Sequence, residues 1–367
     1  MKHDSLIRCV LLDPQRATSL SALDWDLLIR QGRSANLLAR LHDVLETDGL
    51  ARHVPSAARH HLVSASRIAE RQAQATRWEV ECIRAALSKV ASVCVLLKGT
   101  AYLACELPHA RARIFSDVDI MVRRAEVPEV ESALIMNGWR GEELSAYDQR
   151  YYRRWMHEIP PMRHTRRGTS IDVHHTILPE IARVKVNTAA LFDGLRPIPG
   201  VAGFHVLQPP DLVLHSATHL FHEGEFENGL RDLFDLDAML RHFGADRAFW
   251  PQLIERAATL GLRRPAFYAL RYTGALLGTP IAHETIATVS KWGPHVFVLS
   301  LMDWCYRRAL QPPHASCGDR QTRIARWLLY VRSHWLRMPL HLLIHHIGRK
   351  LWQRLVSKDA EQHPAIQ

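Results

Sequence analysis

Two stretches decide the fold that the sequence predicts: VCVLLKGTA at residues 93–101 and SDVDIMV at residues 116–122. The first opens with apolar and β-branched residues, which is typical of a buried strand, and runs through a Lys-Gly-Thr turn into a helix. The second alternates polar and apolar residues and predicts another strand. A third alternating stretch, SIDVH at residues 170–174, predicts one more short strand. These stretches together indicate a mixed α/β core.

The sequence on both sides of this core is helical in pattern. Apolar residues recur at helical spacing before residue 90 and again from the Pro209-Pro210 pair onward. We therefore predict an α+β fold in which a small mixed-sheet core is flanked by an N-terminal helical region and a larger C-terminal all-helical domain. The predicted parts are residues 1–90 (helical), 91–207 (core), 208–310 (helical substrate or lid domain) and 311–367 (basic helical extension).

Composition limits the class of protein. The chain has 367 residues, 47% of them hydrophobic, and a net charge of +10 with 23 histidines. That balance favours anionic partners such as nucleotides, nucleic acid, phosphorylated substrates or an acidic membrane surface, although arginine-rich solvated helices explain it equally well. The six cysteines form no CxxC pair, which argues against a zinc ribbon or a thioredoxin-like site. We see no apolar run long enough for a transmembrane segment and no export signal, and we expect a cytoplasmic protein.

Three aspartates carry the chemistry that the sequence predicts. Asp117 and Asp119 lie two residues apart on a predicted strand, so their side chains share one face. Carboxylates this close repel each other unless a cation lies between them, and oxygen ligands suit Mg²⁺. Asp172 lies on another predicted strand. If the two strands pair, the three carboxylates meet and can hold two metal ions, one of which activates an attacking oxygen.

The Lys98-Gly99-Thr100 turn has features of a phosphate site. A strand that turns into a helix directs backbone N–H groups and the positive helix end towards an anion. Gly99 would let a phosphate approach the backbone, Thr100 would donate its hydroxyl, and Lys98 would add a positive charge. The spacing is not that of a P-loop.

The ordered set of these motifs resembles the DNA polymerase β-type nucleotidyltransferase superfamily. The closest resemblance is to the bacterial uncharacterised nucleotidyltransferase family, in which LKG-x-A, R-x-x-SD-x-D and D-x-H-[HW] recur. The matching segments are residues 97–101, 113–119 and 172–175, and the resemblance covers about residues 20–280.

The resemblance implies roles for these residues. Asp117 and Asp119 would bind Mg²⁺ or Mn²⁺, and Asp172 would complete the metal site or act as general base. A nucleoside triphosphate would be the substrate. Its binding residues would be Lys98, Gly99, Thr100, Arg113 and Ser116.

The implied activity is transfer of a nucleoside monophosphate to a hydroxyl or phosphate of an acceptor. The acceptor could be a polysaccharide precursor, a small molecule, a peptide or a protein. The gap between Thr100 and Asp117 is longer than in the shortest superfamily members and is similar to that of nucleotidyltransferase toxins of the AbiEii type, which modify transfer RNA. Such a toxin, and a non-catalytic nucleotide-binding regulator, are the alternatives.

Other polar residues are weaker candidates. His215, His219 and His222 share a helix face and, with Asp232, could bind a transition metal, but are more simply interpreted as lining a cleft between core and helical domain. Arg231 and Asp232 are expected to pair there, and His174 shares the face of Asp172. Residues 320–367 interleave arginine and tryptophan, a pattern compatible with RNA, a membrane surface or simple packing.

Overall fold

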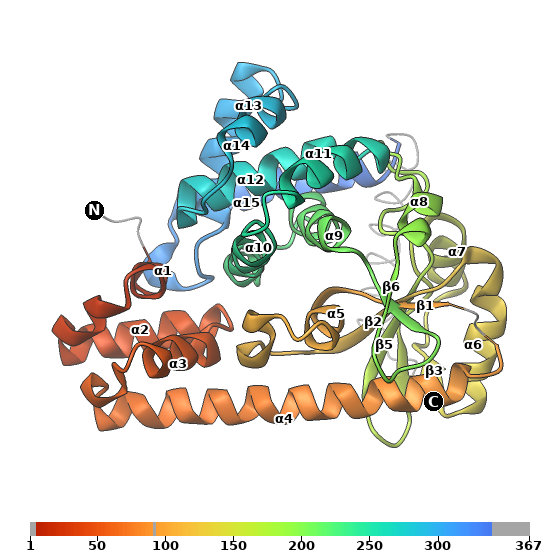
Figure 1. Ribbon diagram of the computed structural model, residues 1–367, viewed down its shortest axis with the longest axis horizontal. Helices are drawn as coiled ribbons and strands as arrows, with labels where there is room; N and C mark the ends of the chain where they lie inside the picture. Colours follow the sequence, from red (N-terminus) through yellow and green to blue (C-terminus); the bar gives the residue numbers. More distant parts are fainter. Residues whose placement is uncertain (1–4, 91–92, 340–367) are drawn as a thin grey trace, which may run out of the picture.

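The computed structural model describes residues 5–90 and 93–339 of the chain (Figure 1). A seven-stranded sheet lies at one side, the N-terminal helices and the long helix α4 run along one edge of the molecule, and the C-terminal helices lie opposite them. The predicted α+β fold, a mixed sheet flanked by helical regions, is confirmed.

The sheet is mixed and has the strand order β3-β4-β5-β2-β1-β7-β6. Its strands are β1 (Cys94–Leu96), β2 (Asp117–Met121), β3 (Trp139–Gly141), β4 (Met162–His164), β5 (Ser170–His174), β6 (Arg196–Pro197) and β7 (Phe204–Val206). β2 pairs with β1 in the antiparallel sense and with β5 in the parallel sense. The three predicted strands, β1, β2 and β5, are therefore neighbours at the centre of the sheet.

The N-terminal region is built from amphipathic helices. They are α1 (Leu6–Leu12), η1 (Pro14–Ser19), α2 (Ala22–Ser34), α3 (Leu38–Thr47), η2 (Ala51–His53) and α4 (Ser56–Leu87). A capping box between Ser21 and Asp24 satisfies free backbone donors at the start of α2. With 32 residues, α4 is about 48 Å long, so it reaches from the N-terminal helices to the sheet (Figure 1).

Short helices connect the strands of the core. They are α5 (Lys98–Ala104), η3 (Pro108–Ala112), η4 (Arg124–Glu126), α6 (Val127–Met136), α7 (Ala146–Trp155) and α8 (Thr188–Asp193). α5 begins at Lys98, directly after β1, whereas the sequence predicted its start at residue 101. The Lys-Gly-Thr segment is thus the first turn of the helix rather than a loop before it.

The C-terminal region is all-helical. It contains α9 (Pro209–His222), α10 (Gly229–Phe243), α11 (Phe249–Thr259), α12 (Arg263–Leu277), α13 (His283–Ser290), α14 (Val296–Ala309), η5 (Ala315–Cys317) and α15 (Arg320–Arg337). All of these elements lie in the two regions that the sequence predicted to be helical, residues 208–310 and 311–367. The part of the predicted basic extension that follows residue 339 lies outside the described residues.

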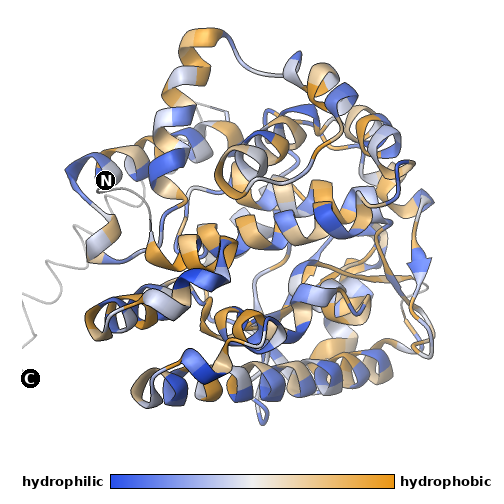
Figure 2. Ribbon diagram, turned by 60° about the vertical axis from the view of Figure 1, so that its left-hand side comes forward, coloured by the Kyte–Doolittle hydropathy of each residue, from blue (hydrophilic) through white to orange (hydrophobic). Residues whose placement is uncertain are grey.

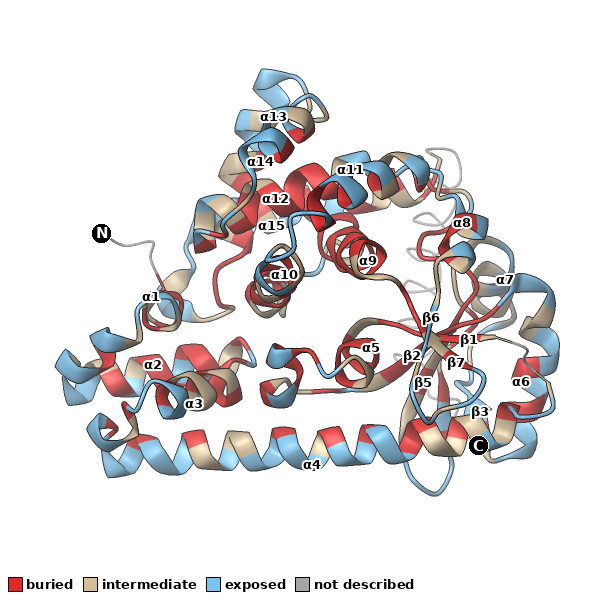
Figure 3. Cartoon of the chain, viewed as in Figure 1, coloured by how far each residue is buried: buried red, intermediate tan, exposed pale blue. Residues whose placement is uncertain are grey.

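One hydrophobic core joins the three regions. It runs from Ile7 in α1 through the strands to Leu329 in α15, and the buried residues lie on the facing sides of the helices (Figure 3). Hydrophilic and hydrophobic residues share the same helices, as amphipathic packing requires (Figure 2). In the part of the chain that is described, none of the helices combines the length and the hydropathy needed to cross a membrane.

Candidate active site

The pairing of β2 with β5 brings the three aspartates together. Their parallel register sets Asp119 opposite Asp172 and Asp117 opposite Ser170. One carboxylate oxygen from each of Asp117, Asp119 and Asp172 lies within 4.8 Å of the other two. Each strand exposes its alternate residues to the same face, so two short sequence motifs far apart in the chain produce a single cluster.

Asp119 is buried, and its carboxylate contacts the side chains of Lys98 and His174. Its Oδ1 atom lies 2.7 Å from Lys98 Nζ and 3.0 Å from His174 Nε2. Burial raises the pKa of Asp119, but Lys98 and His174 outweigh it and hold the pKa well below its ordinary value. Within the described residues, no hydrogen-bond donor approaches Asp119 Oδ2. The carboxylate is therefore ionised and keeps one oxygen for a further cation.

Asp172 has the opposite electrostatic environment. Burial, together with the nearby carboxylates of Asp119 and Glu158, raises its pKa to about 7. Unlike Asp119, this side chain forms no ion pair with a cationic residue among the described residues. A cation between the carboxylates would relieve this repulsion.

Glu158 is a residue that the sequence did not single out. Its carboxylate lies 3.3 Å from His174 Nδ1, while Nε2 of the same ring contacts Asp119. Burial lowers the pKa of His174, but Asp119 and Glu158 outweigh this effect and raise it. His157, Glu158 and His174 also form a second group of metal-type ligands within 4.8 Å. His174 Nδ1 forms no hydrogen bond among the described residues, so we interpret Glu158 as a residue that favours the protonated form of His174 by its charge.

The Lys-Gly-Thr turn differs in detail from its predicted role. Lys98 has a φ of +46°, a left-handed conformation that is strained for a residue with a side chain, and its ammonium group contacts Asp119. Thr100 is buried, does not line the main cavity, and its hydroxyl has no partner among the described residues. A side chain at position 99 would clash with the guanidinium group of Arg113. Position 99 must therefore be glycine to leave room for the Arg113 side chain, whether or not the glycine also contacts a phosphate.

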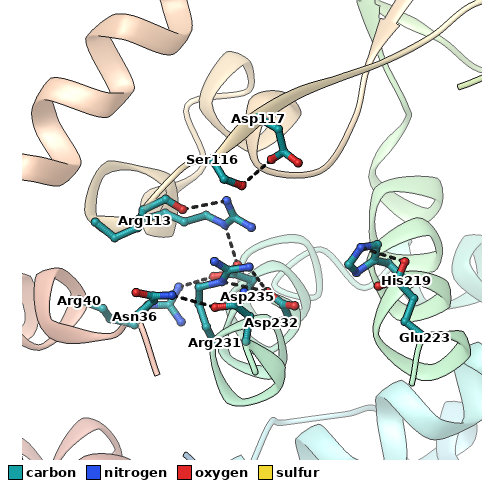
Figure 4. Close-up of polar contacts among 12 residues, drawn as sticks. Asn36, Arg40, Arg113, Ser116, Asp117, His219, Glu223, Arg231, Asp232 and Asp235 are labelled. Atoms are coloured by element: carbon teal, nitrogen blue, oxygen red, sulfur yellow. Dashed lines mark hydrogen bonds and ion pairs between the residues drawn. The ribbon is translucent and has the colours of Figure 1, made fainter. Parts of the chain in front are cut away.

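Arg113 belongs to a buried ion-pair network that links the three regions (Figure 4). Asp235 of α10 accepts from Arg113 Nε at 2.9 Å and from Arg40 of α3 at 2.9 Å. Burial raises the pKa of Asp235, but the two guanidinium groups outweigh it and hold the pKa below its ordinary value. The guanidinium group of Arg113 is therefore already paired with the Asp235 carboxylate. This pairing reduces the positive charge that Arg113 can offer to a nucleotide.

A cavity of about 180 Å³ lies between the core and the C-terminal helices. Its lining comes from α5, β2 and the segment before β2 on one side, and from α9 and α10 on the other. The residues are Lys98, Gly99, Tyr102, Arg113, Ser116, Asp117, Asp119, Ser216, His219, Asn228, Arg231, Asp232 and Asp235. Ser116 Oγ donates to Asp117 Oδ1 at 2.6 Å. The expected Arg231–Asp232 pair is present, with Nη2 and Oδ1 2.8 Å apart (Figure 4).

The predicted histidine face of α9 borders this cavity. His219 lines it and lies 3.3 Å from Glu223, while His215 and His222 line a small neighbouring cavity shared with Lys98 and His174. Burial lowers the pKa of His219 to about 3, so its ring is neutral at pH 7. Among the described residues, no metal-type ligand group includes a histidine of α9. His219 thus lines the larger cavity, and His215 and His222 line the smaller one beside it.

The donor set of the cluster fits a hard divalent cation. Asp117, Asp119 and Asp172 offer oxygen atoms only, and the raised pKa of Asp172 indicates a carboxylate that lacks a balancing positive charge. Asp117 and Asp119 also line the cavity, so a cation bound to them would face its contents.

A mixed sheet with Asp-x-Asp on one strand, a third aspartate on its parallel neighbour and a Lys-Gly-Thr helix start beside them defines a nucleotidyltransferase-type protein. The sequence pattern of the uncharacterised nucleotidyltransferase family matches residues 21–278, and the chain belongs to this family. No curated protein and no solved structure matches it.

Proposed function

We propose that this protein is a Mg²⁺- or Mn²⁺-dependent enzyme that transfers a nucleoside monophosphate from a nucleoside triphosphate to an acceptor. The single observation that carries the proposal is the cluster of Asp117, Asp119 and Asp172, of which the first two line a cavity shared by the core and the C-terminal helices. The family membership supports a transferase of this general kind.

The reaction forms one bond and breaks one. An oxygen of the acceptor attacks the α-phosphorus of the triphosphate, the bond to the bridging oxygen of the β-phosphate breaks, and pyrophosphate leaves. The bound divalent ion would neutralise charge on the phosphates and align them. Asp172 would complete the metal site or act as the general base that takes the proton lost by an acceptor hydroxyl.

The remaining residues of the cavity would position the substrate. Lys98 lies at the cavity wall and offers a positive charge to a phosphate group. Arg231 and Asp232 of α10, with Ser216 and His219 of α9, face the same space from the helical side. The cavity is smaller than the ~300–1,000 Å³ of typical small-molecule sites, so part of a nucleotide and its acceptor would extend beyond it.

Several acceptors are compatible with this site, because the helical walls combine neutral, acidic and basic groups. A hydroxyl or phosphate of a polysaccharide precursor, small molecule, peptide or protein is our first proposal. A transfer RNA acceptor, as used by toxin-type nucleotidyltransferases, and a purely regulatory nucleotide-binding role are the alternatives.

The test uses each nucleoside triphosphate radiolabelled at the α-phosphate, with Mg²⁺ or Mn²⁺ and a cell extract. The extract is then separated into RNA, protein and small-molecule fractions, so that the labelled fraction identifies the acceptor class. We expect Asp117→Asn and Asp119→Asn to reduce transfer by about a hundredfold or more, while Asp26→Asn, which alters an exposed ion pair with Arg30, leaves it unchanged. Nucleotide binding without transfer in any fraction would favour the regulatory alternative, and absence of both would contradict the proposal.

A further inference from the structure

Helix α15 presents an apolar face to solvent. Its inner face is buried against the body, through Ala325, Leu329 and Leu336. On the opposite face, exposed fractions remain high for four large apolar side chains: Ile324 at 52%, Trp327 at 61%, Val331 at 44% and Trp335 at 47%.

These four side chains form one continuous row. At 100° per residue they fall within an arc of about 80° on the helix surface. We call them the α15 stripe. Single exposed apolar residues are common on protein surfaces, whereas contiguous exposed apolar residues mark interaction sites. Because α15 buries one apolar face and exposes a second apolar row, we interpret the exposed row as an interaction site.

Helix α15 itself carries positive charge only. The 18 residues of α15 include five arginines and no aspartate or glutamate. Arg320 and Arg323 at its start have no hydrogen-bond or ion-pair partner in the described part of the chain. At its other end, the guanidinium group of Arg183 lies 4.1 Å from the centroid of the Trp335 ring. The apolar row is therefore bounded by cationic groups.

The end of α14 adds to this basic edge. Arg308 Nη2 donates to Gln321 Oε1 at 2.6 Å, which holds the last turn of α14 beside the first turn of α15. Arg308 thus adds positive charge beside the first turn of α15.

We propose that the α15 stripe docks onto an anionic phospholipid surface. Tryptophan suits the membrane–water interface, Ile324 and Val331 gain from entering hydrocarbon, and the arginines attract acidic head groups. A nucleic acid offers no hydrocarbon for Ile324 and Val331.

The experiment measures sedimentation of the full chain with phosphatidylcholine vesicles, with and without phosphatidylglycerol, in the absence of nucleotide. We expect binding only to the anionic vesicles, weakened by added salt. The double variant Trp327→Ser/Trp335→Ser should bind at least about tenfold more weakly. Arg320→Gln/Arg323→Gln should lose about 25-fold, since each arginine contributes roughly fivefold.

A matched control comes from α4, where Trp78 is 65% exposed and lies outside the stripe. Trp78→Ser should bind vesicles as the unmodified chain does. The proposal is overturned if the chain ignores anionic vesicles, if both stripe variants bind unchanged, or if the stripe variants lose RNA binding while keeping vesicle binding. Because the altered residues are exposed, circular dichroism should show the same fold for all variants, and the arginine pair provides an independent reading if a tryptophan variant misfolds.

Discussion

Asp172 and Asp119 lie opposite each other on paired strands but differ in their charge state. Asp119 is held ionised by Lys98 and His174, whereas burial and neighbouring carboxylates raise the pKa of Asp172 to about 7. Between the ordinary value of 3.8 and about 7, the folded protein therefore binds more protons at this position than the unfolded chain. The stability that this difference contributes is complete at low pH and is lost as the pH rises through about 7.

We therefore expect the metal-free protein, in the presence of a chelator, to lose stability between pH 5 and pH 8, by about 2–4 kcal/mol from this residue. Asp172→Asn should flatten that decline, because the amide does not titrate. Adding Mg²⁺ above pH 7 should restore stability to the unmodified protein but less to the variant. Urea unfolding across this pH range measures all three effects, and an equally steep decline in Asp172→Asn would contradict the assigned pKa.

A substitution of Gly99 tests whether the Lys-Gly-Thr turn needs glycine for packing against Arg113 or for binding a phosphate. A methyl group there would clash with Arg113 Nη1 and lie 3.0 Å from Arg113 Cζ. Because Arg113 is buried and paired with Asp235, we expect Gly99→Ala to lower the free energy of unfolding by about 2–4 kcal/mol. Gly141→Ala, where nothing lies within 4 Å, is the control and should be nearly neutral. If Gly99→Ala lost nucleotide binding at unchanged stability, the glycine would serve the phosphate alone.

At the scale of elements, Asp235 joins α10 to α3 and to the segment before β2. Its side chain is 2% exposed and accepts from Arg40 and Arg113. Asp235→Asn leaves buried guanidinium groups without a counter-charge, so we expect a loss of about 3–5 kcal/mol in urea unfolding. In Asp26→Asn, where the altered ion pair is exposed, the loss should stay below about 1 kcal/mol. Comparable losses in the two variants would show that the buried network contributes no more than a surface pair.

The sequence predicted those elements that carry a periodic pattern. The alternation in SDVDIMV and SIDVH identified β2 and β5, and with them the three aspartates. Strands β3 and β6, with three and two residues, are too short to show alternation. Glu158 reaches the site through an isolated bridge to His174, and Asp235 meets Arg40 across 195 positions of sequence. Contacts of this kind depend on tertiary packing, so no local pattern indicates them.

At the scale of the whole molecule, the cavity is formed jointly by the core and the C-terminal helices, and one hydrophobic core continues through both. The boundaries predicted at residues 90 and 207 remain a proposal. If the regions fold as one unit, circular dichroism and tryptophan fluorescence should report a single, coincident unfolding transition. Separate transitions would indicate independent domains.

Ligand binding should then stabilise the whole chain, because a nucleotide in the cavity contacts α5 and β2 on one side and α9 and α10 on the other. A Mg²⁺–triphosphate complex at a hundred times its dissociation constant should add about 2.7 kcal/mol and shift both optical probes together. Asp119→Asn should show no shift, since the variant lacks the ionised carboxylate that faces the cavity. A ligand-induced shift seen by only one probe would mean that the nucleotide binds one region alone, and the shared cavity would not be its site.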